Sequence, residues 1–258
     1  MSVLATQVGA IAGRSITRTA RQPASAIPPL IFPVALMLIN SGGLHASTLL
    51  PGFPTNSFLA FALAVPFIQG ALFSTMNAGT DLARDIQTGF FSRLSLTPVR
   101  GAALLTGQLA GIVVLGVVQA IFYIATGLLL GVDFQAGAAG IALLLMYAAL
   151  VSLGFGALGS FLALRTGSGE SIQALFPALF VFLFISSMNT PRNLIAVDWF
   201  RFLASVNPVS YLIECVRSLI ITGWDAEALA LGFSIAIVLT VVSLAAAGWA
   251  LGQRMERT

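Results

Sequence analysis

A polar segment interrupts a chain that is otherwise strongly apolar, and it reads DLARDIQTGFFSRLSLTPVRGAALLTGQ from Asp81 to Gln108. The charged residues at its start would form the polar first turns of a helix, and they are Asp81, Arg84 and Asp85. The residues that follow would give this helix an apolar surface, and they include Phe90, Phe91, Leu94 and Leu96. Pro98 would end it, because proline disfavours helical geometry in the residue before it. The pattern therefore predicts an amphipathic helix over 81–98.

Two roles are open to such a helix. A helix that carries both charges and bare aromatic rings suits docking into a groove of a soluble partner protein. The same pattern would also serve to anchor the loop in the lipid interface. The residues alone leave both interpretations open.

A second group of polar residues lies within residues 190–227. Asn207 is a natural N-cap and Pro208 a natural first helical residue, so a helix should begin there. Glu214 and Arg217 lie three residues apart on this helix, and we expect them to pair across one of its faces. The preceding stretch VDWFRFLASV is also amphipathic and aromatic. We expect two short helices that dip into the outer leaflet and return, which is tolerated where protein buries the backbone.

Residue types exclude several kinds of catalytic chemistry. The chain has one cysteine, Cys215, and one histidine, His45. An intramolecular disulfide and a cysteine-cluster metal site are therefore excluded, and a histidine-based zinc site is disfavoured. None of the 258 residues is lysine, so the chain has no P-loop, which needs a lysine on the phosphates. We expect no metal, no cofactor and no nucleic acid to bind this chain.

The composition indicates a protein that is solvated by lipid. Apolar residues make up 58% of the chain and charged residues 8%, and the mean hydropathy is +0.98. Soluble domains have roughly 25% charged residues. Helices of roughly 20 apolar residues cross a bilayer, and six spans are expected, at 27–44, 57–79, 101–130, 136–164, 171–188 and 228–251. Pro66 should kink the second of them.

Arginine placement predicts the orientation in the membrane. Nine arginines fall on the side of the N-terminus, namely Arg14, Arg18, Arg21, Arg84, Arg93, Arg100, Arg165, Arg254 and Arg257. Three fall on the other side, namely Arg192, Arg201 and Arg217. An excess of basic residues marks the cytoplasmic side, so both termini are expected inside the cell. Residues 1–22 are expected to form an amphipathic helix at the inner interface, whose arginines reach lipid phosphates.

Acidic residues give little support to ion-coupled transport. Proton relays use acidic side chains within membrane spans, whereas all nine acidic residues fall in loops, at span ends or in 190–227. Glu214 is the best candidate for a buried acid. An ion-coupled secondary transporter remains an alternative, as does a membrane scaffold that transports nothing.

Small residues spaced by four would let helices approach closely, as at Gly107 and Gly111, Gly127 and Gly131, and Ser152, Gly156 and Ser160.

Two stretches carry motifs that can be compared with known families. The first is DIQTGFFSRLSLTPVRGAALLTGQ, with Asp85, Gly89, Arg93, Leu94, Pro98, Leu105 and Gly107 as its motif residues. The second is NPVSYLIECVRSLIITG, with Asn207, Pro208, Glu214 and Arg217. Both resemble the motifs of ABC-2-type transporter permeases, and especially those of the daunorubicin-resistance branch. The resemblance covers the whole chain in order. Ser92 and Gln108 depart from the pattern, since many relatives carry an acidic and a basic residue there.

The resemblance implies a fold and a set of partners. The fold would be an all-α polytopic membrane domain over 1–258, with six transmembrane helices, an N-terminal amphipathic connector helix, a cytoplasmic coupling helix and a re-entrant outer helical hairpin before the last span. Such permeases pair as two membrane subunits, identical or different, and bind two separate ATP-binding subunits, in which ATP and Mg²⁺ are expected.

The resemblance also assigns roles to residues. Contact with the ATP-binding subunit would fall to Asp81, Arg84, Asp85, Gly89, Phe91, Arg93, Leu94 and Pro98. The connector helix would use Arg14, Arg18 and Arg21, and the outer gate Asn207, Pro208, Glu214 and Arg217. The expected function is export of an amphipathic drug or lipid-like compound across a bacterial plasma membrane. Export of a polysaccharide or glycolipid is the alternative within the same family.

Overall fold

The computed structural model describes residues 9–15, 17, 21, 23–89 and 101–255. Residues 9–15 are helical. The further elements are α2 (Pro23–Gly43), η1 (His45–Leu49), α3 (Phe58–Ala62), α4 (Ala64–Gln87), α6 (Gly101–Leu129), α7 (Gly137–Thr166), α8 (Gly169–Phe184), η2 (Arg192–Leu194), α9 (Asp198–Val206), α10 (Pro208–Ile221) and α11 (Ala226–Met255). Within the described ranges, the regular structure is helical throughout.

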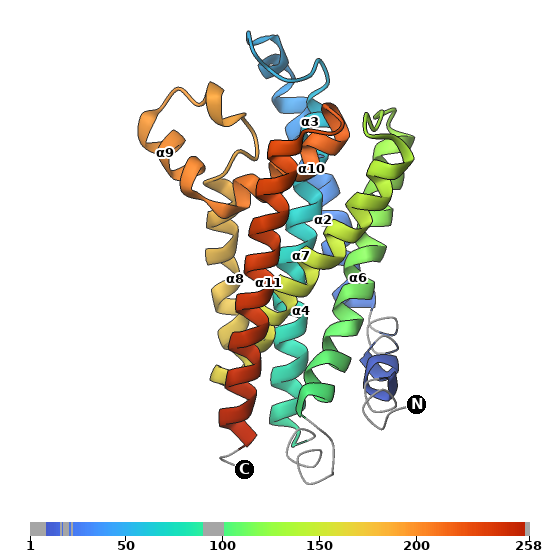
Figure 1. The fold of residues 1–258 in the computed structure, drawn as a ribbon, viewed down its shortest axis with the longest axis vertical. Coiled ribbons are helices and arrows are strands. Elements are labelled where there is room, and N and C mark those ends of the chain that lie inside the picture. Colours follow the sequence, from blue (N-terminus) through green and yellow to red (C-terminus); the bar gives the residue numbers. More distant parts are fainter. Residues whose placement is uncertain (1–8, 16, 18–20, 22, 90–100, 256–258) are drawn as a thin grey trace.

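The long helices lie side by side as a bundle (Figure 1). α7 packs against α4, α6 and α11, while α4 also contacts α2 and α8. α4 and α7 therefore form the centre of the bundle. The shorter elements α3, α9 and α10 lie at one end, opposite the end that holds residues 9–15 and the last turns of α4, α7 and α11.

Four helices are long and apolar enough to cross a membrane, namely Phe58–Gln87, Leu105–Leu129, Gly137–Thr166 and Ala226–Met255. The chain is thus a multi-pass membrane protein. The expectation of six full spans holds only in part, because Ile27–Gly43 and Gly169–Phe184 are shorter apolar helices. α8 stops at Phe184 instead of reaching 188. Ser186 and Ser187, which follow it, are buried, and they bond to Leu183 and Ser210 instead of continuing the helix. A helix of 16 residues falls short of the roughly 20 that a bilayer requires.

Proline shapes two of the apolar helices, and other residues compensate for the donors that it lacks. α3 and α4 are separated at Leu63, three residues before Pro66, which is the place where a proline kink was expected. α2 contains Pro28, Pro29 and Pro33. Pro33 cannot donate to the carbonyl of Pro29, and the hydroxyl of Tyr123 from α6 donates to that carbonyl instead.

α4 continues past the expected end of the second span. It runs without a break through Asp81 and Asp85 to Gln87, so the boundary between a span at 57–79 and a separate helix over 81–98 is absent. The reason is local, because no proline or glycine lies between Thr80 and Thr88. Thr88 then closes the helix by bonding the carbonyl of Arg84 through both its N–H and its hydroxyl. Gly89 follows with φ of 68°, which favours glycine.

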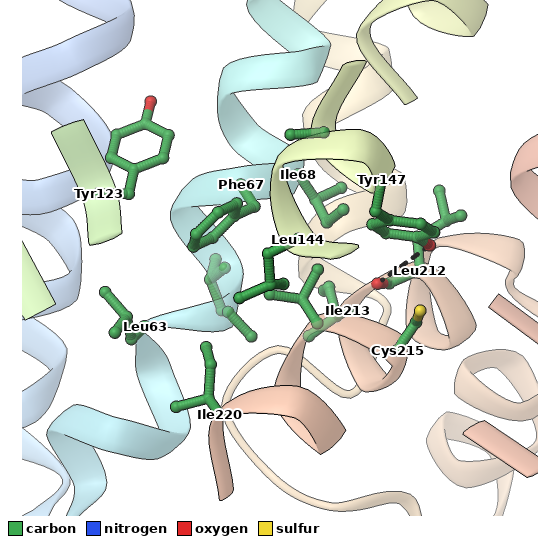
Figure 2. Close-up of a cluster of buried hydrophobic side chains, with 14 of the residues drawn as sticks. Leu63, Phe67, Ile68, Tyr123, Leu144, Tyr147, Leu212, Ile213, Cys215 and Ile220 are labelled. Atoms are coloured by element: carbon green, nitrogen blue, oxygen red, sulfur yellow. Dashed lines mark hydrogen bonds between the residues drawn. The ribbon is translucent and has the colours of Figure 1, made fainter. Parts of the chain in front are cut away.

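The largest core cluster joins α3, α4, α6, α7 and α10 (Figure 2). Leu63 and Ile68 are fully buried there beside Ile213 of α10. Tyr147 of α7 is also buried, and its hydroxyl donates to the carbonyls of Leu212 at 3.4 Å and Gly232 at 3.3 Å. The core therefore attaches the short helix α10 firmly to the long helices.

Small residues allow the close approach of α4 and α7. A Cβ added at Gly159 would lie 2.0 Å from the backbone oxygen of Thr75. At the same crossing the hydroxyl of Thr75 donates to the carbonyl of Phe155 at 3.0 Å. Gly116 of α6 meets Ser152 of α7 just as closely, with 2.1 Å between the added Cβ and the serine hydroxyl. These contacts agree with the role of small residues in membrane helix packing.

We predict that Gly159→Ala destabilises the protein by about 1–3 kcal/mol, because the added methyl group would force the backbones of α4 and α7 apart. The measurement is the melting temperature in detergent. Gly248→Ala is the matched control, since nothing lies within 4 Å of a Cβ added at that position of α11. Equal melting temperatures for the two variants would contradict the prediction.

Candidate functional site

The segments expected to be cytoplasmic lie together at one end of the bundle (Figure 1). This end, which we call the terminal end, comprises residues 9–15, the last turns of α4, α7 and α11, and the first turns of α6 and α8. Three of its helices carry an arginine in the last turn, namely Arg84, Arg165 and Arg254. Positive charge interacts favourably with the carbonyl end of a helix. We call the opposite end, which holds η2, α9 and α10, the α9–α10 end.

An ion pair ties the N-terminal helix to α4. The guanidinium of Arg14 donates to both carboxylate oxygens of Asp85, with Nη2–Oδ1 at 3.1 Å and Nη1–Oδ2 at 3.3 Å. The Asp85 side chain is only 15% exposed, against 44% for Arg14. Asp85 was expected to face a partner protein, but its carboxylate is engaged within the chain.

A second contact fixes the N-terminal helix against α6. The hydroxyl of Ser15 donates to the carbonyl of Gln108 at 3.0 Å. A Cβ added at Gly111 would lie 2.2 Å from that hydroxyl, so glycine is needed for this approach. The expected connector helix is thus packed on α4 and α6. Of its other arginines, Arg21 is exposed, and Arg18 lies outside the described residues.

The residues expected to contact a partner are divided by the limits of the described structure. Asp81, Arg84 and Asp85 lie on the last turns of α4, with Arg84 exposed, and Gly89 lies directly after this helix. The others, Phe91, Arg93, Leu94 and Pro98, lie outside the described residues. Their docking role therefore stays a prediction.

Hydrogen bonds connect the other helix ends at the terminal end. The amide of Gln87 donates to the carbonyl of Gly167, in the turn between α7 and α8, at 3.2 Å. Arg254 of α11 donates to the carbonyl of Leu164 at 2.9 Å. In the opposite direction Arg165 of α7 donates to the side chain of Gln253 at 3.1 Å. The end of α4 is thus bonded both to the connector helix and to the turn that leads into α8.

At the α9–α10 end, Asn207 joins two helices through one side chain. Its Oδ1 accepts the N–H of Val209 at 2.9 Å, which caps α10 as the sequence predicts, with Pro208 as the first helical residue. Its Nδ2 donates to the carbonyls of Phe182 and Ile185, both at 2.6 Å. These carbonyls lie at the C-terminal end of α8. Asn207 therefore satisfies groups at the end of one helix and the start of the next.

Glu214 pairs with Arg192 and not with Arg217. Arg192 donates to both carboxylate oxygens, from Nε at 2.8 Å and from Nη2 at 2.7 Å, and its guanidinium lies 4.2 Å from the ring centre of Tyr211. Burial lowers the pKa of Arg192, while the Glu214 carboxylate and the Tyr211 hydroxyl raise it, with a net rise. The expected pairing was wrong because Arg192 occupies both carboxylate oxygens of Glu214, while Arg217 is held by backbone carbonyls.

Arg217 instead binds backbone carbonyls. Its Nε donates to the carbonyl of Phe61 at 3.2 Å, and its Nη2 donates to those of Ser187 and Met188, both at 3.1 Å. The guanidinium also lies 3.5 Å from the ring centre of Phe61. The residue is 6% exposed. Arg217 therefore fastens α10 to the break between α3 and α4 and to the segment after α8.

Sequence reasoning missed several of these partners. Ser210 of α10 accepts the N–H of Ser187 at 3.1 Å, and Arg192 reaches Glu214 across 22 residues. Neither contact has a helical or strand spacing that could have indicated it.

The described residues contain no group of three or more His, Cys, Asp or Glu that could hold a metal ion. They do form a pocket of about 560 Å³ beside Arg192 and Arg217.

Comparison with known proteins identifies the family that the motifs indicate. Residues 6–221 match the family model described as ABC-2 type transporter. The chain is 29% identical over 197 residues to the daunorubicin resistance ABC transporter permease protein DrrB1 of Streptomyces coeruleorubidus, an alignment that covers 74% of this chain and 65% of that protein. This chain thus spans slightly less than two thirds of that relative.

Two further relatives share the name putative transport permease ycf38. The protein from Porphyra purpurea is 25% identical over 214 residues, covering 82% of this chain and 72% of the relative. The protein from Pyropia yezoensis is 26% identical over 216 residues, covering 83% and 73%.

We predict that Asn207→Asp destabilises the protein by about 1–3 kcal/mol, although aspartate is as good an N-cap as asparagine. The carboxylate keeps the bond to Val209 but cannot donate to the carbonyls of Phe182 and Ile185. Thermal unfolding in detergent measures the effect. Ser168→Asp is the control, because Ser168 caps α8 as an acceptor only from Ser171. If both variants melt at the same temperature, the donor role of Asn207 is refuted.

We also predict a coupling free energy of about 1–2 kcal/mol between Arg192 and Glu214 in a double-mutant cycle with glutamine at each position. The pair is bidentate and mostly shielded from water, with 29% and 22% of the side chains exposed. Arg201 and Asp198 give the control cycle, since that pair is 47% and 86% exposed and should couple by less than about 1 kcal/mol. Equal coupling in the two cycles would count against the assignment.

Proposed function

The chain belongs to the ABC-2 type transporter family, and on that premise we propose that it is the permease subunit of an exporter driven by ATP hydrolysis in a separate subunit. The family provides the membrane subunits of ABC transporters, which associate with an ATP-binding subunit. This division of labour accounts for a chain without lysine and hence without a P-loop. ATP and Mg²⁺ would bind in the partner, and the complete exporter would hold two ATP-binding subunits and two permease subunits.

The observation that carries the proposal is the place of Asp85. It is the first matched residue of the family's first motif, and it lies on the last turns of α4, the long helix that is most buried in the bundle. Arg14 binds it from the connector helix, and Gln87, two residues on, binds the turn before α8. A partner that pushes on residues 81–98 would therefore displace α4, the connector helix and the α7–α8 turn together.

The charge distribution supports an orientation with the terminal end in the cytoplasm. From the sequence, nine arginines were assigned to the side of the N-terminus and three to the other side, and the described members of each set lie at the ends to which they were assigned. Basic residues accumulate on the cytoplasmic side of membrane proteins. We place the chain in a bacterial plasma membrane, with the ATP-binding subunits below the terminal end and the α9–α10 end as the outer gate.

An amphipathic drug or lipid-like compound is the proposed cargo. The first relative is named for daunorubicin resistance. In this chain the rings of Phe32, Phe73, Phe176 and Phe180 contact one another between α2, α4 and α8. Phe32 remains 46% exposed beside this cluster. This cluster of aromatic rings is partly exposed and partly buried. Such an apolar surface suits contact with an apolar cargo better than contact with a polysaccharide.

We predict that Asp85→Arg lowers ATP-dependent export by about 5- to 150-fold, the range given by coupling free energies of about 1–3 kcal/mol. Two arginines would then face each other at the contact between α4 and the connector helix. The measurement is uptake of a fluorescent anthracycline into inverted vesicles that contain this chain and its ATP-binding subunit. Arg14→Asp combined with Asp85→Arg should restore part of the activity, because the pair is rebuilt with reversed charges.

The controls for this experiment test the proposed function itself. Vesicles with a hydrolysis-deficient ATP-binding subunit should show no uptake. Uptake that persists with no ATP-binding subunit, and that follows an ion gradient instead, would replace the proposal with a secondary transporter.

A further inference from the structure

A pocket of about 560 Å³ opens at the α9–α10 end, within the size range of ligand-binding sites. It lies among η2, α9, α10 and the start of α11, and its charged lining residues are Arg192, Arg201, Arg217, Glu214 and Asp225. Arg201 is paired with Asp198, and Arg192 is paired with Glu214. Asp225 caps the start of α11. Among the described residues, Arg217 is therefore the cation of the pocket that has no carboxylate bonded to it.

Arg192 and Arg217 are held in place in the pocket, and each keeps one N–H group available as a hydrogen-bond donor. In the described residues, Arg217 uses Nε and Nη2 for its carbonyl partners, and Nη1 has no hydrogen-bond partner. Arg192 likewise uses Nε and Nη2 for Glu214, and its Nη1 has none there. The ring of Tyr211 supports Arg192, and the ring of Phe61 supports Arg217. Guanidinium groups fixed in this way are suited to phosphate oxygens.

The charge of Arg217 lacks a carboxylate of its own. Its hydrogen-bond acceptors are neutral carbonyl groups, and Glu214, whose charge acts on it, already forms two bonds with Arg192. Burying a charge without a counter-ion costs several kcal/mol. An anion in the pocket would offset part of this cost.

The helix that forms one wall of the pocket also presents an apolar face. α9 contributes Arg201 and Ser205 to the pocket, while Trp199, Phe202 and Val206 are 65%, 65% and 60% exposed. These three lie at positions i, i+3 and i+7, on one side of the helix. Figure 1 shows α9 at the outside of the bundle, above the end of α8. An exposed amphipathic helix at the end of a transmembrane bundle is typical of helices that lie in the lipid interface.

We propose that this pocket binds the phosphate of an anionic lipid headgroup, held by Arg192 and Arg217, with the lipid chains against the apolar face of α9. The proposal joins two independent observations, the available Nη1 donors of Arg192 and Arg217 in the pocket and the apolar surface beside it. It does not depend on transport, so it can fail or succeed separately from the proposed function.

The test is the rate at which a cysteine in the pocket reacts with a neutral, water-soluble maleimide. Ser205→Cys places the thiol in the pocket wall, and the native Cys215 is fully buried, so the parent protein gives the background rate. The protein is held in nanodiscs of phosphatidylcholine alone or with phosphatidylglycerol, so that both faces are accessible. We expect alkylation about tenfold slower with phosphatidylglycerol, the protection given when the lipid is about ten times above its dissociation constant.

Two variants separate the pocket from general effects of the membrane. Ala46→Cys lies in η1 at the same end, is exposed and does not line the pocket, so its rate should be the same in both bilayers. Arg192→Gln in the Ser205→Cys protein removes one of the two guanidinium groups proposed to hold the phosphate. It also frees the Glu214 carboxylate, which then disfavours an anion beside Arg217. We expect this variant to react at the same rate in both bilayers.

The outcomes distinguish the two possible sources of phosphate. Protection by phosphatidylglycerol that inorganic phosphate does not reproduce in phosphatidylcholine supports the proposal. Equal protection by inorganic phosphate would make the pocket a site for soluble anions and overturn the assignment to lipid. Equal rates in the two bilayers, or protection that survives Arg192→Gln, would overturn the proposal altogether.

Discussion

A carbonyl group that loses its helical donor in an apolar surrounding costs a protein several kcal/mol unless another donor replaces it. This chain creates such groups where proline interrupts α2, where α3 breaks from α4, and where α8 ends early. Tyr123 donates to Pro29, Arg217 to Phe61, and Asn207 to the last turn of α8. Tyr123, Asn207 and Arg217 are thus placed where the backbone departs from regular helix. The short helices at the α9–α10 end are held by the same bonds, because Asn207 and Arg217 belong to α10 or to its cap.

Much of the architecture could be predicted from hydropathy and helix signals. α6, α7 and α11 begin and end within four residues of the third, fourth and sixth expected spans. The cap at Asn207 and the break before Pro66 follow from local chemistry that a single sequence displays. Local signals fail where the deciding partner is distant. The early end of α8 is accompanied by the bond between Ser187 and Ser210 of α10, a partner that lies outside residues 171–188.

The charged residues show the same limit more sharply. Glu214 and Arg217 have the spacing of a helical pair, yet each finds a better partner elsewhere, Glu214 in a loop arginine and Arg217 in three carbonyls. Asp85 looks like a surface charge in the sequence but is bound by Arg14, 71 residues away. Helical spacing states which residues can meet on one helix. It does not show whether a distant residue offers a better partner, such as a bidentate arginine or an unpaired carbonyl. The tertiary structure decides which of these contacts forms.

The continuity of α4 gives the bundle a stiff central rod. Its 24 residues extend about 36 Å and are enclosed by α2, α6, α7 and α8, so the rod has little room to bend along its length. In the proposed exporter, a displacement imposed at Gln87 would be relieved at the break beside Leu63. There Arg217 binds the carbonyl of Phe61, so this one arginine would link a movement of the terminal end to the closure of the α9–α10 end.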